Sequence, residues 1–228
     1  MHPTDTLLHP SGPALACRPG RESGKNRAVG GVRSLLLLAL VLGVTGCGPV
    51  VISIDYRPFP AAPPPPAPAA SVVLQVRNVR GSERGGQTER VGTIYNSSRP
   101  LAGPTTYDGR PINASSPDEV ADTVRAATVD ALRHAGVSLR GGGPTLIASV
   151  KEYWVDGPTI YQAIVVVAYD LVDGNGVIRW HADARGDSSV MMLIGNGLVK
   201  NFRVALLQVA QQAGDAFRSP YFQAAIRQ

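Results

Sequence analysis

The sequence has 228 residues, enough for one domain or two small ones. Both cysteines, Cys17 and Cys47, lie near the N-terminus, so removal of a leader would leave no intrachain disulfide and would exclude a disulfide-stapled secreted scaffold. Five of the basic and two of the acidic residues precede Cys47, which leaves 17 basic and 15 acidic residues and a net charge of only +2 after it. A charge this small gives no reason to expect a nucleic-acid partner.

An apolar run of 11 residues, 34–44 (SLLLLALVLGV), directly follows Arg33. A membrane-spanning helix needs ~20 apolar residues, so this run is too short to stay in the bilayer as an anchor. A basic flank, a short apolar stretch and small residues at its end are typical of a secretory signal and favour it over a buried core helix. We predict that residues 1–46 are a signal peptide. Residues 1–33 are long for the region before the apolar run, so we expect translation to start at the Val32 codon.

The end of this run, Val44-Thr45-Gly46-Cys47, resembles the lipobox of bacterial lipoproteins, in which small residues precede an acylated cysteine. The resemblance implies cleavage between Gly46 and Cys47 and acylation of the Cys47 thiol; a buried structural cysteine would not explain the position. Each buried CH₂ contributes ~0.8 kcal/mol, so two or three acyl chains would anchor the protein firmly. Gly48 stands where an aspartate would retain a lipoprotein in the inner membrane. We therefore expect the periplasm-facing side of the outer membrane, with the inner membrane as the alternative.

A proline-rich segment follows, because residues 58–70 (PFPAAPPPPAPAA) contain seven prolines. Such a composition favours extended polyproline II conformation. We interpret residues 47–71 as the acylated cysteine and a linker that lifts a single domain, residues 72–228, off the lipid surface; a ligand for a proline-reading module is the alternative. Residues 50–54 (VVISI) are predicted to add an edge strand.

Within the domain, β-branched residues predict a first strand over 72–79, followed by a long loop over 80–115 with a short strand near 91–95. Residues 116–119 (SPDE) predict a helix N-terminus with a serine cap and a capping-box glutamate, and Gly136 predicts a left-handed residue at the end of that helix. Its apolar stripe consists of Val120, Val124, Ala127, Ala131, Leu132 and Ala135.

The second half of the domain alternates between β-branched runs and turn residues. Asp173-Gly174-Asn175-Gly176 predicts a hairpin turn. The predicted elements are strands over 137–139, 145–154, 159–172 and 177–185, a loop over 187–197 and a final helix over 198–217. Its buried face is predicted to hold Leu198, Phe202, Ala205, Leu206, Val209 and Ala213. This order predicts an α+β fold: a mainly antiparallel β-sheet with two α-helices packed on one face.

The order of elements and their residues resemble the YajG-type bacterial envelope lipoprotein family over most of the mature chain. The resemblance includes the lipobox, the runs VVISI, VVLQVRNVR and RVGTIYN, the capped helix, the hairpin, the final helix and the tail 218–222 (RSPYF). The family commonly has Asp-x-Arg at the end of the first strand, whereas this chain has Asn78-Val79-Arg80, so no role of that acid is carried over. The resemblance implies an envelope lipoprotein without catalytic residues to transfer.

Two histidines follow Cys47. His134, near the end of the first helix, is interpreted as a surface residue favoured by the helix dipole. His181 shares one strand face with Arg179 and Asp183, which we interpret as a solvated polar face. The alternative is a Ser/His/Asp set with Ser188 or Ser189, although no Gly-x-Ser-x-Gly elbow occurs.

No Cys/His cluster indicates zinc and no spacing of acids indicates calcium, so we expect neither a metal nor a cofactor. Gly195-Asn196-Gly197 is interpreted as a helix cap, since it lacks the Gly-Lys-Ser ending of a phosphate loop. The leading hypothesis is a non-enzymatic accessory lipoprotein for envelope assembly or maintenance, bound to the bilayer through Cys47 and to an envelope protein that the sequence does not identify. The alternatives are an auxiliary component of an ABC-type lipid or solute transport system and a periplasmic hydrolase that uses His181.

Overall fold

The computed structural model describes the part of the chain that forms the folded domain. Its described residues are 49–58, 70–95, 109–156, 160–191 and 197–228. The chain divides into two compact units, residues 1–46 and 47–228, and all described residues belong to the second. The predicted signal peptide, the cleavage site at Gly46 and the lipidation site Cys47 therefore lie outside the described residues.

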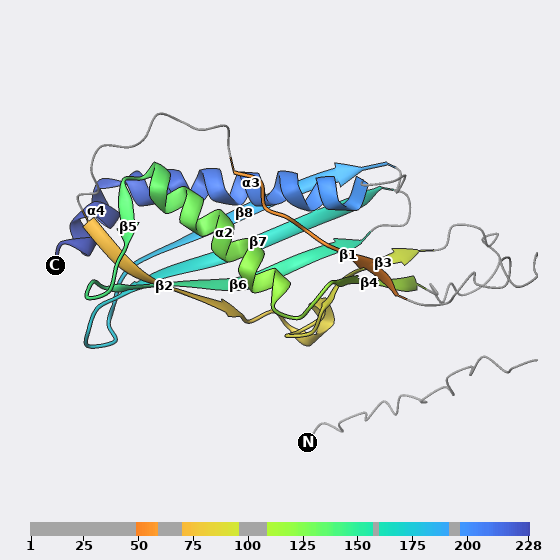
Figure 1. Cartoon of the computed structure of the whole chain (residues 1–228), viewed down its shortest axis with the longest axis horizontal. Coiled ribbons are helices and arrows are strands. Elements are labelled where there is room, and N and C mark those ends of the chain that lie inside the picture. Colours follow the sequence, from red (N-terminus) through yellow and green to blue (C-terminus); the bar gives the residue numbers. More distant parts are fainter. Residues whose placement is uncertain (1–48, 59–69, 96–108, 157–159, 192–196) are drawn as a thin grey trace, which may run out of the picture. The chain divides into compact units, whose positions relative to one another are not determined.

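Three long antiparallel strands, the last of them at the edge, form one side of the mixed sheet of eight strands in the described residues (Figure 1). They are β6 (Thr145–Asp156), β7 (Tyr161–Val172) and β8 (Ile178–Val190). The turn between β7 and β8 forms because the Asp173 carboxylate accepts hydrogen bonds from two backbone N–H groups further along the turn, and Gly176 supplies the positive φ of 81°. The predicted hairpin is confirmed.

The second edge of β6 pairs with two different strands. β2 (Ala70–Asn78) runs parallel to its first half, and β3 (Arg90–Tyr95) pairs with its far end at Val155. The sheet continues from these two strands with β5 (Val137–Leu139) beside β2, β4 (Gly109–Ala114) beside β3, and β1 (Val50–Ile52) parallel to β4. The predicted edge strand near residue 50 is therefore confirmed, and it is part of the same sheet as the rest of the domain.

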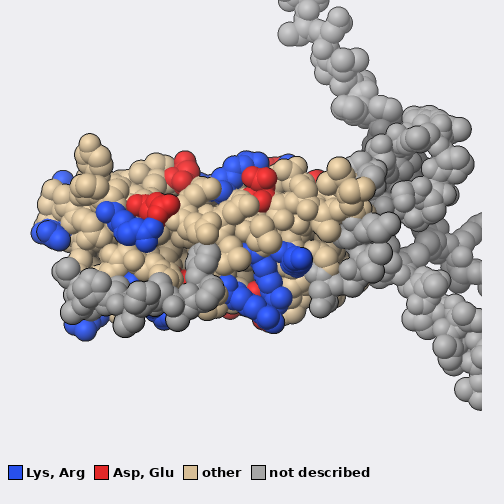
Figure 2. All heavy atoms as spheres, turned by 90° about the horizontal axis from the view of Figure 1, so that it is seen from above, with Lys and Arg blue, Asp and Glu red and all other residues tan. Residues whose placement is uncertain are grey.

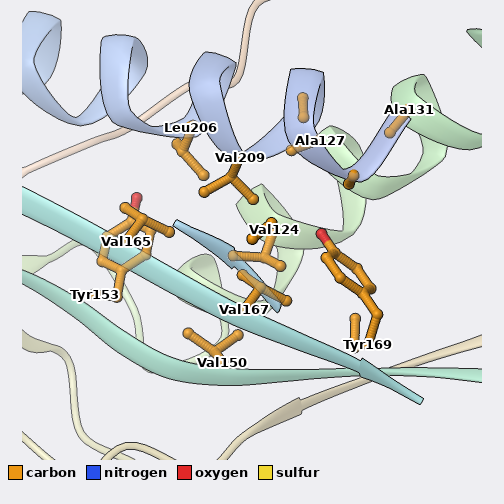
Figure 3. Packing of buried hydrophobic residues seen from close by; sticks show 14 of the residues in the cluster. Val124, Ala127, Ala131, Val150, Tyr153, Val165, Val167, Tyr169, Leu206 and Val209 are labelled. Atoms are coloured by element: carbon orange, nitrogen blue, oxygen red, sulfur yellow. The ribbon is translucent and has the colours of Figure 1, made fainter. Parts of the chain in front are cut away.

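Helices α2 (Glu119–His134) and α3 (Gly197–Arg218) cover one face of this sheet, with the short α4 (Pro220–Ile226) at the end of α3. Figure 3 shows how apolar side chains of both long helices, such as Val124 and Val209, meet those of the strands. Every predicted stripe residue of α2 except the half-buried Ala135, and every one of α3, is buried. The α+β fold is confirmed. None of the described helices is both long and apolar enough to cross a bilayer.

Three local predictions are corrected by the structure. The predicted loop 80–115 contains β4, whose sequence GRPINA is hard to predict as a strand because proline cannot donate a ladder hydrogen bond. The predicted loop 187–197 begins too early, since β8 continues to Val190. The predicted tail after residue 217 contains α4, which begins with Ser219 accepting a hydrogen bond from Phe222 N–H.

The start of α2 also differs from the predicted capping box. Ser116 does accept a hydrogen bond from Glu119 N–H, at 3.2 Å, but the helix begins only at Glu119. The Glu119 carboxylate does not return to the Ser116 backbone; it accepts from Ser115 and from the backbone N–H of Ile54. The glutamate thus joins the helix to the segment around β1.

The free edge of β8 is partly covered by side chains from α3. Gln212 accepts a hydrogen bond from Arg185 N–H and donates to Arg185 C=O, at 3.0 and 2.7 Å, and Gln208 accepts from Asp187 N–H at 2.8 Å. Unpaired backbone groups on a long edge strand favour pairing with another chain. These two glutamines occupy such groups over residues 185–187 and so reduce that risk.

Candidate functional site

The face of the sheet opposite the helices is here called the open face, and its side chains do not pack against the described helices. Successive strand residues point to opposite faces, and on β7 and β8 the odd- and even-numbered residues respectively face the helices. The open face therefore carries a mainly apolar row from β7 beside a polar row from β8. The β7 row is Gln162, Ile164, Val166, Ala168, Asp170 and Val172, and the β8 row is Arg179, His181, Asp183, Arg185, Asp187 and Ser189.

The helix-bearing side has a different surface. In Figure 2, which looks down onto the helices, basic and acidic atoms are interspersed among a larger area of neutral atoms. The described residues on this side thus present no extended area of one charge sign.

His181 lies on the open face between two carboxylates. Its Nδ1 is 2.7 Å from an Asp170 oxygen and its Nε2 is 3.5 Å from an Asp183 oxygen. The hydrogen bond with Asp170 raises the pKa of His181 above its usual value; burial opposes this, and the charges of both aspartates add to the increase. The predicted polar strand face is confirmed in its placement, with Asp170 from β7 as a partner that the sequence did not indicate.

The structure does not bring the alternative Ser/His/Asp set together. Ser188 points to the helix side, where its hydroxyl donates to Asn201 at 2.7 Å. Ser189 shares the open face with His181 but lies eight residues along the strand, roughly 27 Å away at ~3.4 Å per residue. Neither serine hydroxyl can transfer its proton to His181 in this arrangement.

The buried guanidinium of Arg80 organises the turn between β2 and β3. Arg80 is 4% exposed, and its Nη atoms donate to the backbone carbonyls of Thr88, Arg90 and Tyr153 at 2.7, 2.9 and 3.3 Å. Its Nε donates to the side-chain oxygen of Asn78 at 3.0 Å. Burial lowers the pKa of Arg80, but an arginine remains charged at neutral pH. The amide of Asn78 thus keeps the contact that an aspartate would make, without the opposite charge.

The turn that Arg80 holds lies over an indole on the open face. The Trp154 ring is 6% exposed, and the guanidinium carbons of Arg84 and Arg90 are each 5.7 Å from its centroid, within cation–π distance. Trp154 Nε1 donates to Asp156 at 2.9 Å, and Arg84 forms ion pairs with both Asp156 and Glu152 at 3.4 Å. The result is a charged and aromatic cluster at one end of the open face.

Sequence reasoning missed this cluster because the four charged residues and the indole are spread over 73 positions. The one available signal was Asn78-Val79-Arg80 at a strand end followed by a Gly-rich turn, and that signal does not show that Arg80 is buried.

The other predicted histidine, His134, is half-buried on α2, 3.6 Å from the Asp130 carboxylate. Gly197 begins α3, while residues 195 and 196 lie outside the described ranges. The described residues contain no group of three or more potential metal ligands.

We predict that Arg80→Ala destabilises the domain by about 3 kcal/mol or more, because several buried carbonyls would lose their donor and each such loss costs ~1–3 kcal/mol. Arg80→Lys should lose less, since an ammonium can still reach part of the carbonyl set. Urea unfolding followed by tryptophan fluorescence measures both. Arg77→Ala, an exposed arginine three residues earlier, is the control, and an Arg80→Ala variant as stable as this control would contradict the prediction.

We predict that His181 titrates above pH ~6.5 and that Asp170→Asn moves its pKa back toward that value. Because the folded-state pKa is raised, the stability from this pair is fully present below the unfolded pKa of ~6.5 and is lost as pH rises through the folded value. NMR titration of the imidazole checks the shift. Asp183→Asn should have a smaller effect, since that contact is longer; an imidazole in the parent chain that titrates at or below 6.5 would refute the assignment.

Comparisons with known proteins give a fold but no family. No protein-family model matches the sequence, and no curated protein matches it. The structure is similar to protein XCC0632 from Xanthomonas campestris, of family DUF330, with a TM-score of 0.54 and 14% identity over 78% of this chain and 100% of that chain. Weaker similarities are to PelC of Paraburkholderia phytofirmans, solved as a dodecamer (TM-score 0.33, 14% identity, 66% of this chain and 92% of that chain), and to a minor lipoprotein of Acinetobacter baumannii (0.35, 17%, 42% and 84%). The chain therefore has the fold of the Xanthomonas protein, and its likeness to the YajG-type family stays a prediction.

Proposed function

We propose that this chain is a bacterial envelope lipoprotein, cut before Cys47, acylated on that cysteine and held on a membrane with its domain in the periplasm. The lipobox-like Val44-Thr45-Gly46-Cys47 after a short apolar run supports the acylation. The absence of an aspartate at Gly48 supports the outer membrane. The start of β1 at Val50 supports the position of the cut, since the first residues after it enter the fold at once.

The proposed role is non-enzymatic: an accessory protein that contributes to envelope assembly or maintenance by contacts with another envelope component. The observation that carries it is the open face, where a row of apolar side chains runs beside charged ones and no described helix covers either. In that row Ile164, Val166 and Val172 are half-buried and Ala168 is buried, so solvent reaches part of an apolar area that charged side chains border, which is typical of an interaction site. The two arginines over the buried Trp154 support the same role, because Arg84 is partly exposed, Arg90 is exposed and arginine is frequent in protein interfaces.

We predict that Cys47→Ala abolishes acylation and releases the domain from the membrane fraction, because the thiol is the only proposed attachment point for the acyl chains. Intact mass of the purified chain and fractionation of cells that express it measure the two effects. Arg57→Ala, at an exposed position in the segment after Cys47, is the control and should leave both unchanged. An unmodified Cys47 thiol in the parent chain, or an unchanged membrane fraction after the substitution, would be evidence against lipidation.

We predict that a photo-crosslinking amino acid at Val166 or Asp183, both on the open face, captures a discrete envelope component in living cells. The same amino acid at Arg125 of α2 or Gln211 of α3, both exposed on the helix side, is the control and should capture none. Mass spectrometry of the adduct identifies the partner, and capture of transporter subunits would assign the auxiliary role in an ABC-type system. Adducts from the helix side alone, or none from either side in several stress conditions, would contradict an accessory role through this face.

A further inference from the structure

The short segment after the predicted lipidation site is fixed firmly to the domain. Ile54 is 3% exposed; its N–H donates to the Glu119 carboxylate at 2.5 Å, and its C=O accepts from the Thr123 hydroxyl at 3.2 Å. Two residues later, the Tyr56 hydroxyl donates to the buried Asp130 carboxylate at 2.7 Å. Together with the β1–β4 ladder, these contacts hold the segment against α2 over the turns from Glu119 to Asp130.

A second helix contributes to the same attachment. Arg203 of α3 donates from Nε to the Asp55 carbonyl at 3.0 Å, and its guanidinium is 3.6 Å from the Asp55 carboxylate. Residues 50–56 are therefore part of the folded domain, and the Pro-rich residues 59–69 join two strands of that domain. The interpretation of the Pro-rich stretch as a spacer between lipid and domain is thus wrong in its geometry: its length does not set the distance between Cys47 and the sheet.

The register of the sheet shows from which end the chain enters. One row of paired residues crosses the sheet from β1 to β8: Val50, Ile112, Gly92, Val155, Ala163 and Ser188. Beyond this row β3, β6 and β8 end, and β4 and β7 begin; this end of the sheet is here called the β1 end (Figure 1). Since β1 runs parallel to β4, the chain before Val50 comes from the β1 end.

Cys47 is three residues before Val50, so it lies at most ~11 Å from it at 3.3–3.6 Å per residue. Two other residues are separated from the row by the same number of chain positions: Ile160 is three residues before Ala163, and Met191 is three residues after Ser188. Ile160 is 53% and Met191 73% exposed. Both apolar side chains therefore reach about as far beyond the sheet as an acylated Cys47 can.

We infer that the β1 end faces the bilayer and that Ile160 and Met191 contact its interfacial region. This inference rests on the proposed acylation of Cys47, because the acyl chains bring the β1 end to the lipid. Apolar side chains held at the depth of the acyl attachment gain by leaving water for the boundary between headgroups and acyl chains.

The test places an environment-sensitive fluorophore on a single introduced cysteine in the acylated full chain, in vesicles of phosphatidylethanolamine and phosphatidylglycerol that contain headgroup-spin-labelled phosphatidylcholine. Ile160→Cys and Met191→Cys are the two test sites. Val177→Cys is the control, because Val177 is 49% exposed in the turn at the opposite end of β7, a 12-residue strand roughly 40 Å long. We expect strong loss of fluorescence at both test sites and none at the control.

The intact mass of each labelled chain is measured first, so that the two proposals can fail separately. A chain without acyl mass would overturn the proposed lipoprotein and this inference with it. An acylated chain that is quenched equally at both ends, or at Val177→Cys alone, would overturn the orientation and leave the lipoprotein in place. The two exposed test sites check each other, since a local defect at one does not affect the other.

Discussion

The attachment of Ile54 to α2 is the constraint on which the placement of this domain depends. Burial alone would raise the pKa of Glu119, but hydrogen bonds from Ser115 and from the Ile54 backbone outweigh it and hold the pKa below its usual value. The carboxylate therefore stays ionised and keeps the segment in place at neutral pH, and this contribution is lost as pH falls through the lowered folded-state pKa. Without the attachment, residues 50–56 would be held only by the three-residue ladder of β1 to β4 and by the contacts of Asp55 with Arg203 and of Tyr56 with Asp130.

Sequence patterns predicted the elements whose periodicity is local. The stripes of α2 and α3 repeat at helical spacing. Apart from the half-buried Ala135, the structure buries the α2 stripe against β2, β5 and β6 and the α3 stripe against β7 and β8. The strand β4 was missed because Pro111 and Gly109 hide its pattern and because its strand partners are 14 to 62 residues away in sequence. The Pro-rich segment was misinterpreted for a related reason. Its composition indicates an extended chain, but only the long-range pairing of β1 shows which parts of the protein the segment joins.

The same limit applies to the open face. Alternation placed His181 and Asp183 on one side of a strand, but the nearer partner, Asp170, comes from the neighbouring strand and depends on register. The sequence drew attention to Arg80 because Asn78-Val79-Arg80 resembles a family pattern. Its structural role depends instead on the burial of its guanidinium among backbone carbonyls. A guanidinium with five donors can satisfy carbonyls from three segments at once, and a pattern of residue types contains no information on which carbonyls lack partners.

The end of the sheet at which the chain enters the domain also affects which partners can reach the open face. The long strands extend between the β1 end and the hairpin at Asp173, so the proposed acyl anchor at the β1 end would direct them away from the bilayer. The open face and the edge of β8 would then stand upright at the side of the domain and extend from the lipid over about the length of the strands. A partner embedded in or resting on the same membrane can reach both laterally, whereas a domain on a long flexible tether would present them in every direction. With Cys47 acylated as proposed, the short link to β1 would favour a neighbour on the same membrane over a soluble periplasmic protein as the component that the open face binds.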